Sequence, residues 1–238
     1  VKEGLSFPRV ALDDLRNDSG LNLHLGSMSF FDTKSRAKRY LVQQLPKIFT
    51  AADLDRPFIL FIGRFQYNKG CQFFEPLLRS LSSSSHPQHN ARLIIMGAAN
   101  NYPISSLKSL ERLYPHHMML IDTSDFQGEW GTILRMASDF AFVPSFSEAF
   151  GLVAAEGLLF GQTVVSSGVG GLAEFLRSKN DEREGNAYLF HIFDNTTSSS
   201  SVFDRNLSAE RSRPSLEVLA SGISNCIEAV SKATKEWY

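Results

Sequence analysis

The chain has 238 residues, of which 43% are hydrophobic and 21% charged, a composition that allows a sizeable core. Its net charge of −1 gives no reason to expect nucleic acid or an anionic membrane surface as a partner. No apolar run approaches the ~18 residues of a membrane span. The two cysteines, Cys71 and Cys226, are too few for a disulfide framework, so a reducing, intracellular compartment is expected.

The order of apolar runs and helical patterns along the chain defines the expected fold. Residues 1–31 show no sustained period and are expected to be a lead-in, whereas residues 32–238 are expected to form one domain. Strands are expected at 57–62, 91–98, 118–123, 139–143, 163–167 and 187–193, and helices at 32–49, 71–81, 104–114, 129–137, 150–160 and 216–233. This alternation predicts an α/β fold with a Rossmann-like, doubly wound parallel sheet of about six strands.

Two cations lie in the loop after the first expected strand. Arg64 and Lys69 are five residues apart in the segment GRFQYNKG. In a doubly wound fold this loop lies at the carboxyl edge of the sheet, where ligands bind. An arginine can hold two phosphate oxygens and a lysine adds a point charge, so the pair suits a diphosphate. An ordinary pair of surface charges fits the same pattern.

A second loop follows the fourth expected strand and turns into a helix. The helix over 150–160 carries an apolar stripe that is expected to be its buried face, made of Leu152, Ala155, Leu158 and Leu159. At its start the backbone presents N–H groups without helical partners, and the helix dipole there favours an anion. Gly151 allows a ligand to approach the backbone closely.

Two carboxylates with seven residues between them bracket the start of this helix. Glu148 precedes the helix and Glu156 lies inside it, at most about 12 Å away. A carboxylate repels a bound phosphate by about 4 kcal/mol at about 4 Å and an effective dielectric of about 20, a cost that Arg64 and Lys69 can offset. Glu148 is then suited to sugar hydroxyls and Glu156 to a ribose. In the alternative interpretation, Glu148 is a helix N-terminal acid and Glu156 a solvated helix residue.

With both loops considered together, the chain resembles a known family. GRFQYNKG is similar to the Arg-x4-Lys loop of the C-terminal domain of retaining GT-B glycosyltransferases. PSFSEAFGLVAAEG followed by GVGGL is similar to the Glu-x7-Glu segment and glycine turn of the same domain. Within that group the chain is most similar to glycogen and starch synthases, while sucrose-synthase-like and mannosyl-transferring relatives share the motifs and stay as alternatives.

The resemblance implies a role for each matching charged residue. Arg64 and Lys69 would hold the donor diphosphate and stabilise the departing nucleoside diphosphate as negative charge develops. Glu148 would contact the transferred sugar, and these three residues would be the catalytic groups. Glu156 would bind the ribose of the donor, which the resemblance implies to be ADP-glucose or UDP-glucose.

The same resemblance implies further donor-binding residues, namely Phe126, Phe150, Gly151, Leu152, Gly170 and Gly171. The amides at the helix start would bind phosphates, and the glycine turn would let the backbone approach the donor. Phe126 lies 22 residues before Glu148, in the expected loop after the third strand. Bacterial glycogen synthases carry at this spacing a tyrosine that stacks on adenine; Phe126 keeps the aromatic face without the hydroxyl.

The acceptor implied by the resemblance is an α-glucan, bound by an N-terminal domain that has no counterpart in these residues. That domain carries a Lys-x-Gly-Gly loop and a catalytic histidine in the family. The chain is therefore expected to be the donor-binding half, inactive alone, in the cytoplasm or a plastid. No cofactor is expected, and no His/Cys/Asp cluster has metal-ligand spacing.

Rival interpretations come from other classes. The segment GVGGLA at 168–173 fits the G-x-G-x-x-A fingerprint of an NAD-dependent oxidoreductase. It follows the fifth expected strand rather than the first, and the acids Asp181, Glu182 and Glu184 come too early after it. A second rival is a non-catalytic sugar-nucleotide sensor or structural module. The presence of all four charged residues argues against it, namely Arg64, Lys69, Glu148 and Glu156. A third, a sugar-nucleotide epimerase of the same fold, finds no support in the acids present.

Overall fold

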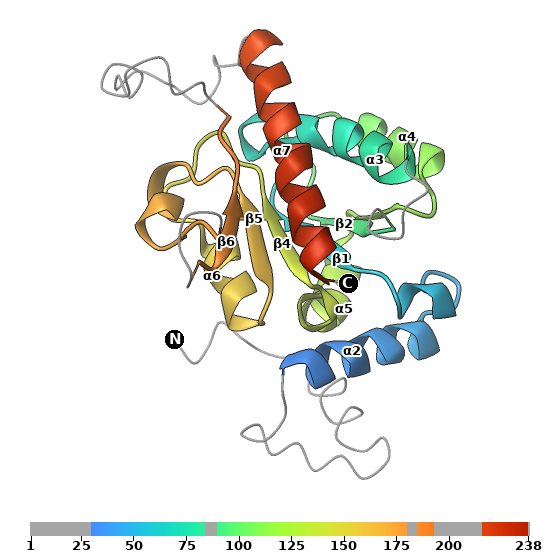
Figure 1. Ribbon diagram of the computed structural model, residues 1–238. Coiled ribbons are helices and arrows are strands. Elements are labelled where there is room, and N and C mark those ends of the chain that lie inside the picture. Colours follow the sequence, from blue (N-terminus) through green and yellow to red (C-terminus); the bar gives the residue numbers. More distant parts are fainter. Residues whose placement is uncertain (1–29, 84–89, 180–184, 193–215, 238) are drawn as a thin grey trace.

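The centre of the molecule is a six-stranded parallel sheet, seen in a computed structural model that describes residues 30–83, 90–179, 185–192 and 216–237 (Figure 1). Its strand order is β3-β2-β1-β4-β5-β6. The strands are β1 (Phe58–Ile62), β2 (Arg92–Met96), β3 (Met118–Ile121), β4 (Phe140–Val143), β5 (Thr163–Ser166) and β6 (Ala187–Leu189). All six expected strands and the doubly wound fold are confirmed. The expected lead-in over residues 1–31 falls almost entirely outside the described residues.

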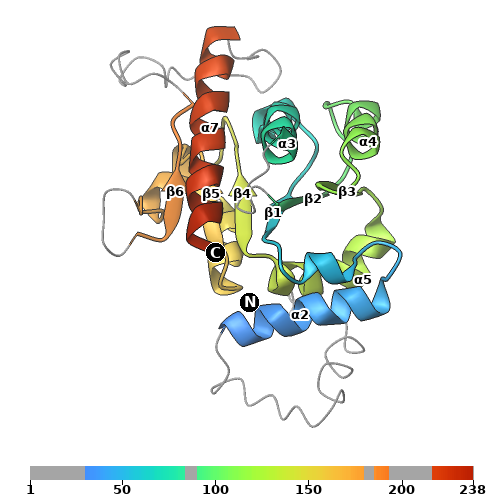
Figure 2. The same cartoon turned by 45° about the vertical axis from the view of Figure 1, so that its right-hand side comes forward.

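Helices cover both faces of this sheet (Figure 2). One face carries α3 (Phe74–Ser83), α4 (Ile104–Leu113) and α7 (Leu216–Trp237), and the other carries α2 (Phe30–Gln44), α5 (Ser124–Ala137) and α6 (Leu152–Leu159). Because both faces are covered, β1 (FILFI) and β2 from Leu93 onward (LIIM) are continuous apolar runs rather than alternating ones. Among the described helices, none has the length and apolar character needed to cross a membrane.

The strand order creates a switch point between β1 and β4. From β1 the chain winds outward through β2 and β3, and from β4 it winds the other way through β5 and β6. β1 is paired with both β2 and β4, through Ile59 and Phe140 among others. In open α/β sheets ligands bind outside the carboxyl ends of the strands at such a point. The fold therefore brings the loops after β1 and β4 side by side.

Helix α6 packs on the sheet through small residues, not through the expected apolar stripe. Ala154 and Gly157 are buried, whereas Leu152 and Leu159 are 67% and 77% exposed. A Cβ at Gly157 would lie 2.6 Å from the Cβ of Ala141 in β4. Small residues thus bring the helix close to the sheet, and of the expected stripe Leu158 packs half-buried on the core while Leu152 and Leu159 do not.

A buried ion pair joins α2 to the amino edge of the sheet. Lys38 Nζ lies 2.7 Å from Asp139 Oδ2, and the two side chains are 4% and 6% exposed. The same carboxylate oxygen accepts the backbone N–H of Phe58 at 2.8 Å. Lys38 also donates to the carbonyl of Arg56 at 2.8 Å, and its ammonium lies 4.9 Å from the ring of Trp237 at the end of α7. The pair therefore connects helices from both faces of the sheet.

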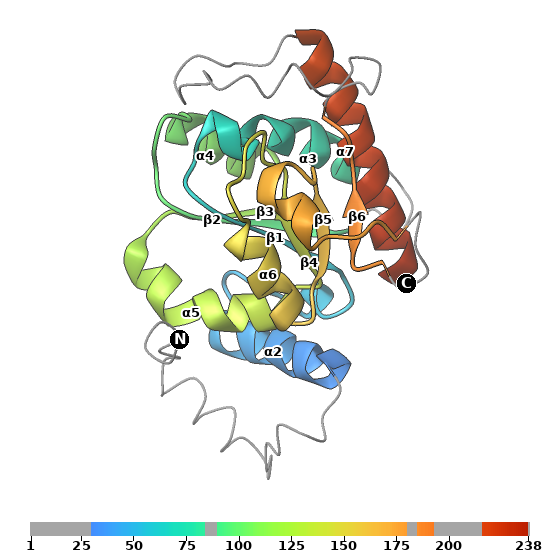
Figure 3. The same ribbon diagram turned by 90° about the vertical axis from the view of Figure 1, so that its left-hand side faces the viewer.

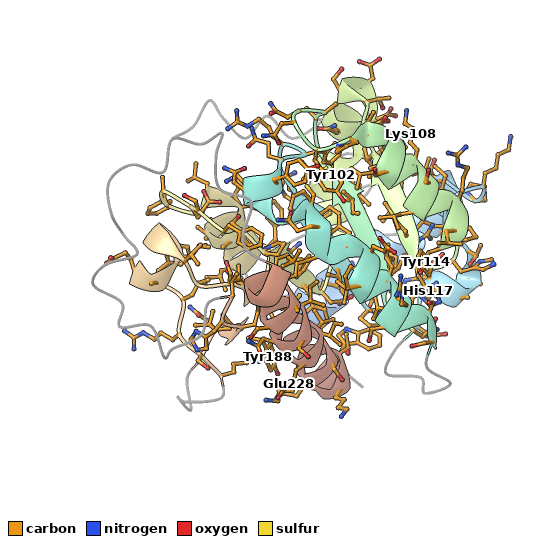
Figure 4. The ribbon with its side chains drawn as sticks, turned by 90° about the horizontal axis from the view of Figure 1, so that it is seen from above. Tyr102, Lys108, Tyr114, His117, Tyr188 and Glu228 are labelled. Carbon is orange, nitrogen blue, oxygen red and sulfur yellow. The ribbon has the colours of Figure 1, made fainter. Side chains whose placement is uncertain are left out.

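His117 lies at the end of the turn that leads from α4 into β3, beside Tyr114 (Figure 4). Its Nδ1 is 3.4 Å from Arg56 Nη2 and 3.3 Å from the carbonyl oxygen of Ala91. Burial, more than any other cause, lowers the pKa of His117 below its usual value of 6.5. The imidazole therefore stays neutral in the folded protein at pH values where the unfolded chain already binds a proton.

This difference makes stability depend on pH. Below pH 6.5 the unfolded chain binds more protons at His117 than the folded one, so its contribution to stability is full above that pH and declines as pH falls. We expect the free energy of unfolding of the wild type to fall more steeply between about pH 7 and about pH 5 than that of His117→Gln. Urea denaturation over this range measures both slopes; parallel curves would contradict the assignment.

Candidate functional site

Three loops meet at the carboxyl edge of the sheet: the first loop (63–70, after β1), the second loop (144–151, after β4) and the third loop (167–173, after β5). The backbone N–H of Phe146 donates to the carbonyl of Asn68 at 2.8 Å and so joins the first and second loops. The N–H of Gly171 donates to the carbonyl of Glu148 at 3.0 Å and joins the second and third. The loops predicted from sequence to form one site are thus brought together.

Glycines permit this contact between loops. Gly70 has φ 77° and Gly170 has φ 58°, a left-handed conformation that glycine adopts without steric cost. A Cβ at Gly70 would lie 2.0 Å from the carbonyl oxygen of Pro144, and one at Gly170 would lie 2.1 Å from that of Glu148. From the sequence, the glycine turn is expected to approach a donor; in the structure the turn packs on the backbone of the second loop.

The first and second loops are also joined by charge. Lys69 Nζ lies 2.6 Å from Glu148 Oε2, and their side chains are 22% and 16% exposed. The hydroxyl of Ser145 donates to the same oxygen at 3.2 Å, a contact that the sequence analysis missed. Arg64 is exposed at the same edge and, within the described part of the chain, has no ion-pair partner. One of the two predicted phosphate-binding cations is therefore held by Glu148, and the other faces solvent.

Glu156 lies on α6 and pairs across to the neighbouring helix α5. Arg135 Nη2 is 3.5 Å from Glu156 Oε2, with side chains 23% and 41% exposed. Figure 3 shows α5 and α6 next to each other on one face of the sheet. No spacing in the sequence indicates this pair, because its members come from different helices separated by β4.

The start of α6 is formed by Gly151, which caps the helix with φ 91°. The first helical bond runs from the N–H of Ala154 to the carbonyl of Gly151 at 2.9 Å. The amides between them, at Leu152 and Val153, belong to the first turn, whose N–H groups have no partner within the helix. The side chains of Phe150 and Leu152 are exposed here, and the ring of Phe150 lies 5.6 Å from that of Phe175, which follows the third loop.

Phe126 lies in the first turn of α5 and not in a loop, so its expected setting is wrong. The helix begins at Ser124, capped by Thr123 with Asp125 in the first turn, and this Thr-Ser-Asp signal could have been found in the sequence. The half-buried ring of Phe126 lies 6.1 Å from the ring of Trp130. The adjacent Gln127 donates to the carbonyl of Gly97 at 2.8 Å and ties the start of α5 to the end of β2.

A buried thiol lies next to the first loop. Cys71 follows the first loop, but burial raises its pKa to about 12, so the thiol stays protonated. The described residues contain no group of three or more His, Cys, Asp or Glu side chains that could hold a metal ion. The groups that the structure places at this edge include the ion pair of Lys69 and Glu148 and the backbone amides at the start of α6.

A six-stranded parallel sheet with helices on both faces and a switch point between β1 and β4 defines an open, doubly wound α/β domain. Residues 46–213 match the family model of glycosyl transferases group 1, and the chain belongs to this family. Its fold is that of the Rossmann-like C-terminal domain of GT-B glycosyltransferases, as in the catalytic domain of starch synthase IV from Arabidopsis thaliana bound to ADP and acarbose. That structure has a TM-score of 0.57 and 17% identity, over 87% of this chain and 40% of its own.

Curated relatives represent more than one branch of the family. Glycogen synthase 1 of Synechococcus sp. (strain JA-3-3Ab) is 29% identical over 68% of this chain and 33% of its own length. The D-inositol 3-phosphate glycosyltransferase of Xylanimonas cellulosilytica is 35% identical over 50% of this chain and 28% of its own length. The chain thus spans about a third or less of the length of these relatives. The expected resemblance to glycogen and starch synthases is confirmed.

Proposed function

We propose that the chain is the donor-binding part of a retaining glycosyltransferase that moves glucose from ADP-glucose or UDP-glucose to an α-glucan. The observation that carries this proposal is the meeting of Arg64, Lys69 and Glu148 with the start of α6 at one switch point. Such an edge offers positive charge and free amides to a diphosphate, and a carboxylate to the neighbouring sugar. The similarity to glycogen synthase 1 supports the glucan branch.

In the proposed reaction, the bond between the sugar and the diphosphate breaks and negative charge grows on the departing nucleoside diphosphate. Arg64, which is exposed and unpaired among the described residues, holds the diphosphate from the outset. Lys69 divides its charge between Glu148 and the phosphates, since it already lies 2.6 Å from that carboxylate. Both cations stabilise the developing charge, which is the largest contribution a preorganised site makes to such a reaction.

The remaining donor contacts fall to residues around this centre. Glu148 accepts hydrogen bonds from the transferred sugar, Glu156 from the ribose, and the ring of Phe126 stacks on the base. The ring of Phe126 is half-buried, so part of it is exposed for the base to stack on. The acceptor is bound by a further domain, without which transfer does not occur.

A second candidate has the same donor site and a different acceptor. The D-inositol 3-phosphate glycosyltransferase of Xylanimonas cellulosilytica is more identical to this chain than the glycogen synthase, although over a smaller part of it. In this candidate Arg64, Lys69 and Glu148 keep their proposed roles toward the donor, and the acceptor is an inositol phosphate instead of an α-glucan.

The donor class is tested by ligand-induced stabilisation. We expect ADP or UDP to raise the unfolding temperature of the chain and NAD to leave it unchanged, since a ligand at about 100 times its Kd adds about 2.7 kcal/mol to stability. Thermal unfolding with each nucleotide measures this, and the larger shift identifies the base. Stabilisation by NAD alone would contradict the transferase proposal.

The phosphate assignment is tested at Arg64. We expect Arg64→Ala to weaken binding of the preferred nucleoside diphosphate about tenfold or more, because a hydrogen-bonded charge contact contributes about 1.5–3 kcal/mol. Isothermal titration calorimetry measures the affinity. Arg79→Ala is the matched control, since Arg79 is an exposed arginine on α3 paired with Glu75 and should bind nucleotide as the wild type does. Equal affinities for all three proteins would show that Arg64 does not contact the diphosphate.

A further inference from the structure

The pair between Arg135 and Glu156 is partly open to water and is expected to add little to stability. Glu156 is 41% exposed, and the two charged groups are 3.5 Å apart. Ion pairs with so much access to water contribute little to stability, because solvent screens them and two long side chains lose rotamer freedom. Glu156 lies in the middle of the helix that starts at the candidate donor site. This position suggests that Arg135 serves ligand binding rather than stability.

Arg135 is itself held in place. Its Nη1 donates to the carbonyl of Gly131 one turn earlier at 3.2 Å, and a Cβ at Gly131 would lie 3.3 Å from that nitrogen. The guanidinium therefore lies over a position where a larger side chain would crowd it. Its own carbonyl accepts from Gln162 Nε2 at 2.8 Å, which fixes the end of α5 to the end of α6. With one nitrogen bonded to Gly131, Nη2 is directed to Glu156.

We infer that Arg135 is a positioning residue, which holds the Glu156 carboxylate in the orientation that accepts hydrogen bonds from both ribose hydroxyls of the donor nucleotide. This rests on the proposed function, in which Glu156 binds ribose. A glutamate on an exposed helix surface otherwise samples several rotamers, and ordering it on binding costs affinity. Arg135 orders the carboxylate before the nucleotide binds, so this cost is not paid on binding. Its charge also offsets the repulsion between Glu156 and a bound diphosphate, as the charge of Lys69 does for Glu148.

The test compares ligands that differ only in the ribose hydroxyls. In the 238-residue chain, the nucleoside diphosphate that binds more tightly, ADP or UDP, is titrated beside its 2′,3′-dideoxy analogue and inorganic pyrophosphate. We expect Arg135→Gln to weaken binding of the ribonucleotide about fivefold, which corresponds to about 1 kcal/mol. Binding of the dideoxy analogue and of pyrophosphate should not change. Arg135→Lys should restore part of the loss, and Arg135→Gln added to Glu156→Gln should cost nothing more.

If Arg135 had only a structural role, Arg135→Gln would change the affinity for all of these ligands to the same extent. Equal losses for ribonucleotide and dideoxy analogue, or no loss at all, would overturn the inference, and a loss for pyrophosphate would show that Arg135 contacts phosphate instead. If Glu156→Gln distinguishes the two nucleotides and Arg135→Gln does not, the inference fails while the proposed function stands. If Glu156→Gln also fails to distinguish them, the ribose assignment is wrong and the inference falls with it. Thermal unfolding of each variant confirms that it is folded during titration.

Discussion

Replacing Lys38 with methionine is expected to lower the free energy of unfolding by about 3–5 kcal/mol, the usual cost of breaking a buried ion pair from one side. Methionine fills most of the volume but takes the hydrogen-bonded cation from the carboxylate of Asp139, at a position only 6% exposed, and leaves Lys34 as the cation that still interacts with it. It also removes the hydrogen bond to the carbonyl of Arg56 and the contact with the Trp237 ring. Urea denaturation at neutral pH measures the change.

Two further variants show whether the buried charge is the cause. In Lys38→Met/Asp139→Asn, the amide oxygen can still accept the N–H of Phe58 and the buried carboxylate is gone, so part of the loss should be recovered. Arg39→Met changes the exposed cation next along α2 and should stay within about 0.5 kcal/mol of the wild type. If the double variant is as unstable as Lys38→Met, packing and not the unpaired carboxylate explains the effect.

The fold could be predicted because its strands are buried on both faces. A strand such as FILFI in β1 or FAFV in β4 needs apolar side chains at every position, and such short runs stand out between helical patterns. The alternation of strands and helices along the chain then predicts a doubly wound sheet. The order of the loops along the chain was enough to place Arg64, Lys69 and Glu148 at one edge.

The packing of α6 could not be predicted from its pattern. An apolar face usually marks the buried side of a helix, yet Leu152 and Leu159 face solvent while Ala154 and Gly157 are buried. The cause is the distance between helix and sheet, which small residues reduce and which no periodicity encodes. Exposed leucines beside the candidate donor site are a feature that only the three-dimensional arrangement reveals.

The charge balance of the site likewise depends on contacts between distant segments. Each of the two glutamates that the sequence analysis singled out has its own cation, Lys69 for Glu148 and Arg135 for Glu156. The first pairing joins two loops that the switch point brings together, so it could be anticipated. The second joins two helices on the same face of the sheet, and no motif in either helix indicates it.

Replacing Gly170 with alanine is expected to disturb the contact between the second and third loops. The residue has φ 58°, where a Cβ costs about 1–2 kcal/mol. That Cβ would also lie 2.1 Å from the carbonyl oxygen of Glu148, which is backbone and cannot rotate away. The second or third loop must move, so we expect a loss of about 2–4 kcal/mol in stability. We also expect at least about tenfold weaker nucleoside diphosphate binding, because misplacement by about 1 Å is costly at a binding site.

The matched control is a glycine at which replacement by alanine should raise stability instead of lowering it. Gly128 lies in α5, and a Cβ there would meet nothing within 4 Å. Gly128→Ala should stabilise the protein by about 0.5–1 kcal/mol, because alanine loses less conformational freedom in a helix, and should leave nucleotide binding unchanged. Calorimetric titration below the unfolding temperature of each variant separates binding from stability. Wild-type affinity in a folded Gly170→Ala protein would show that the contact between the glycine turn and Glu148 does not position the donor site.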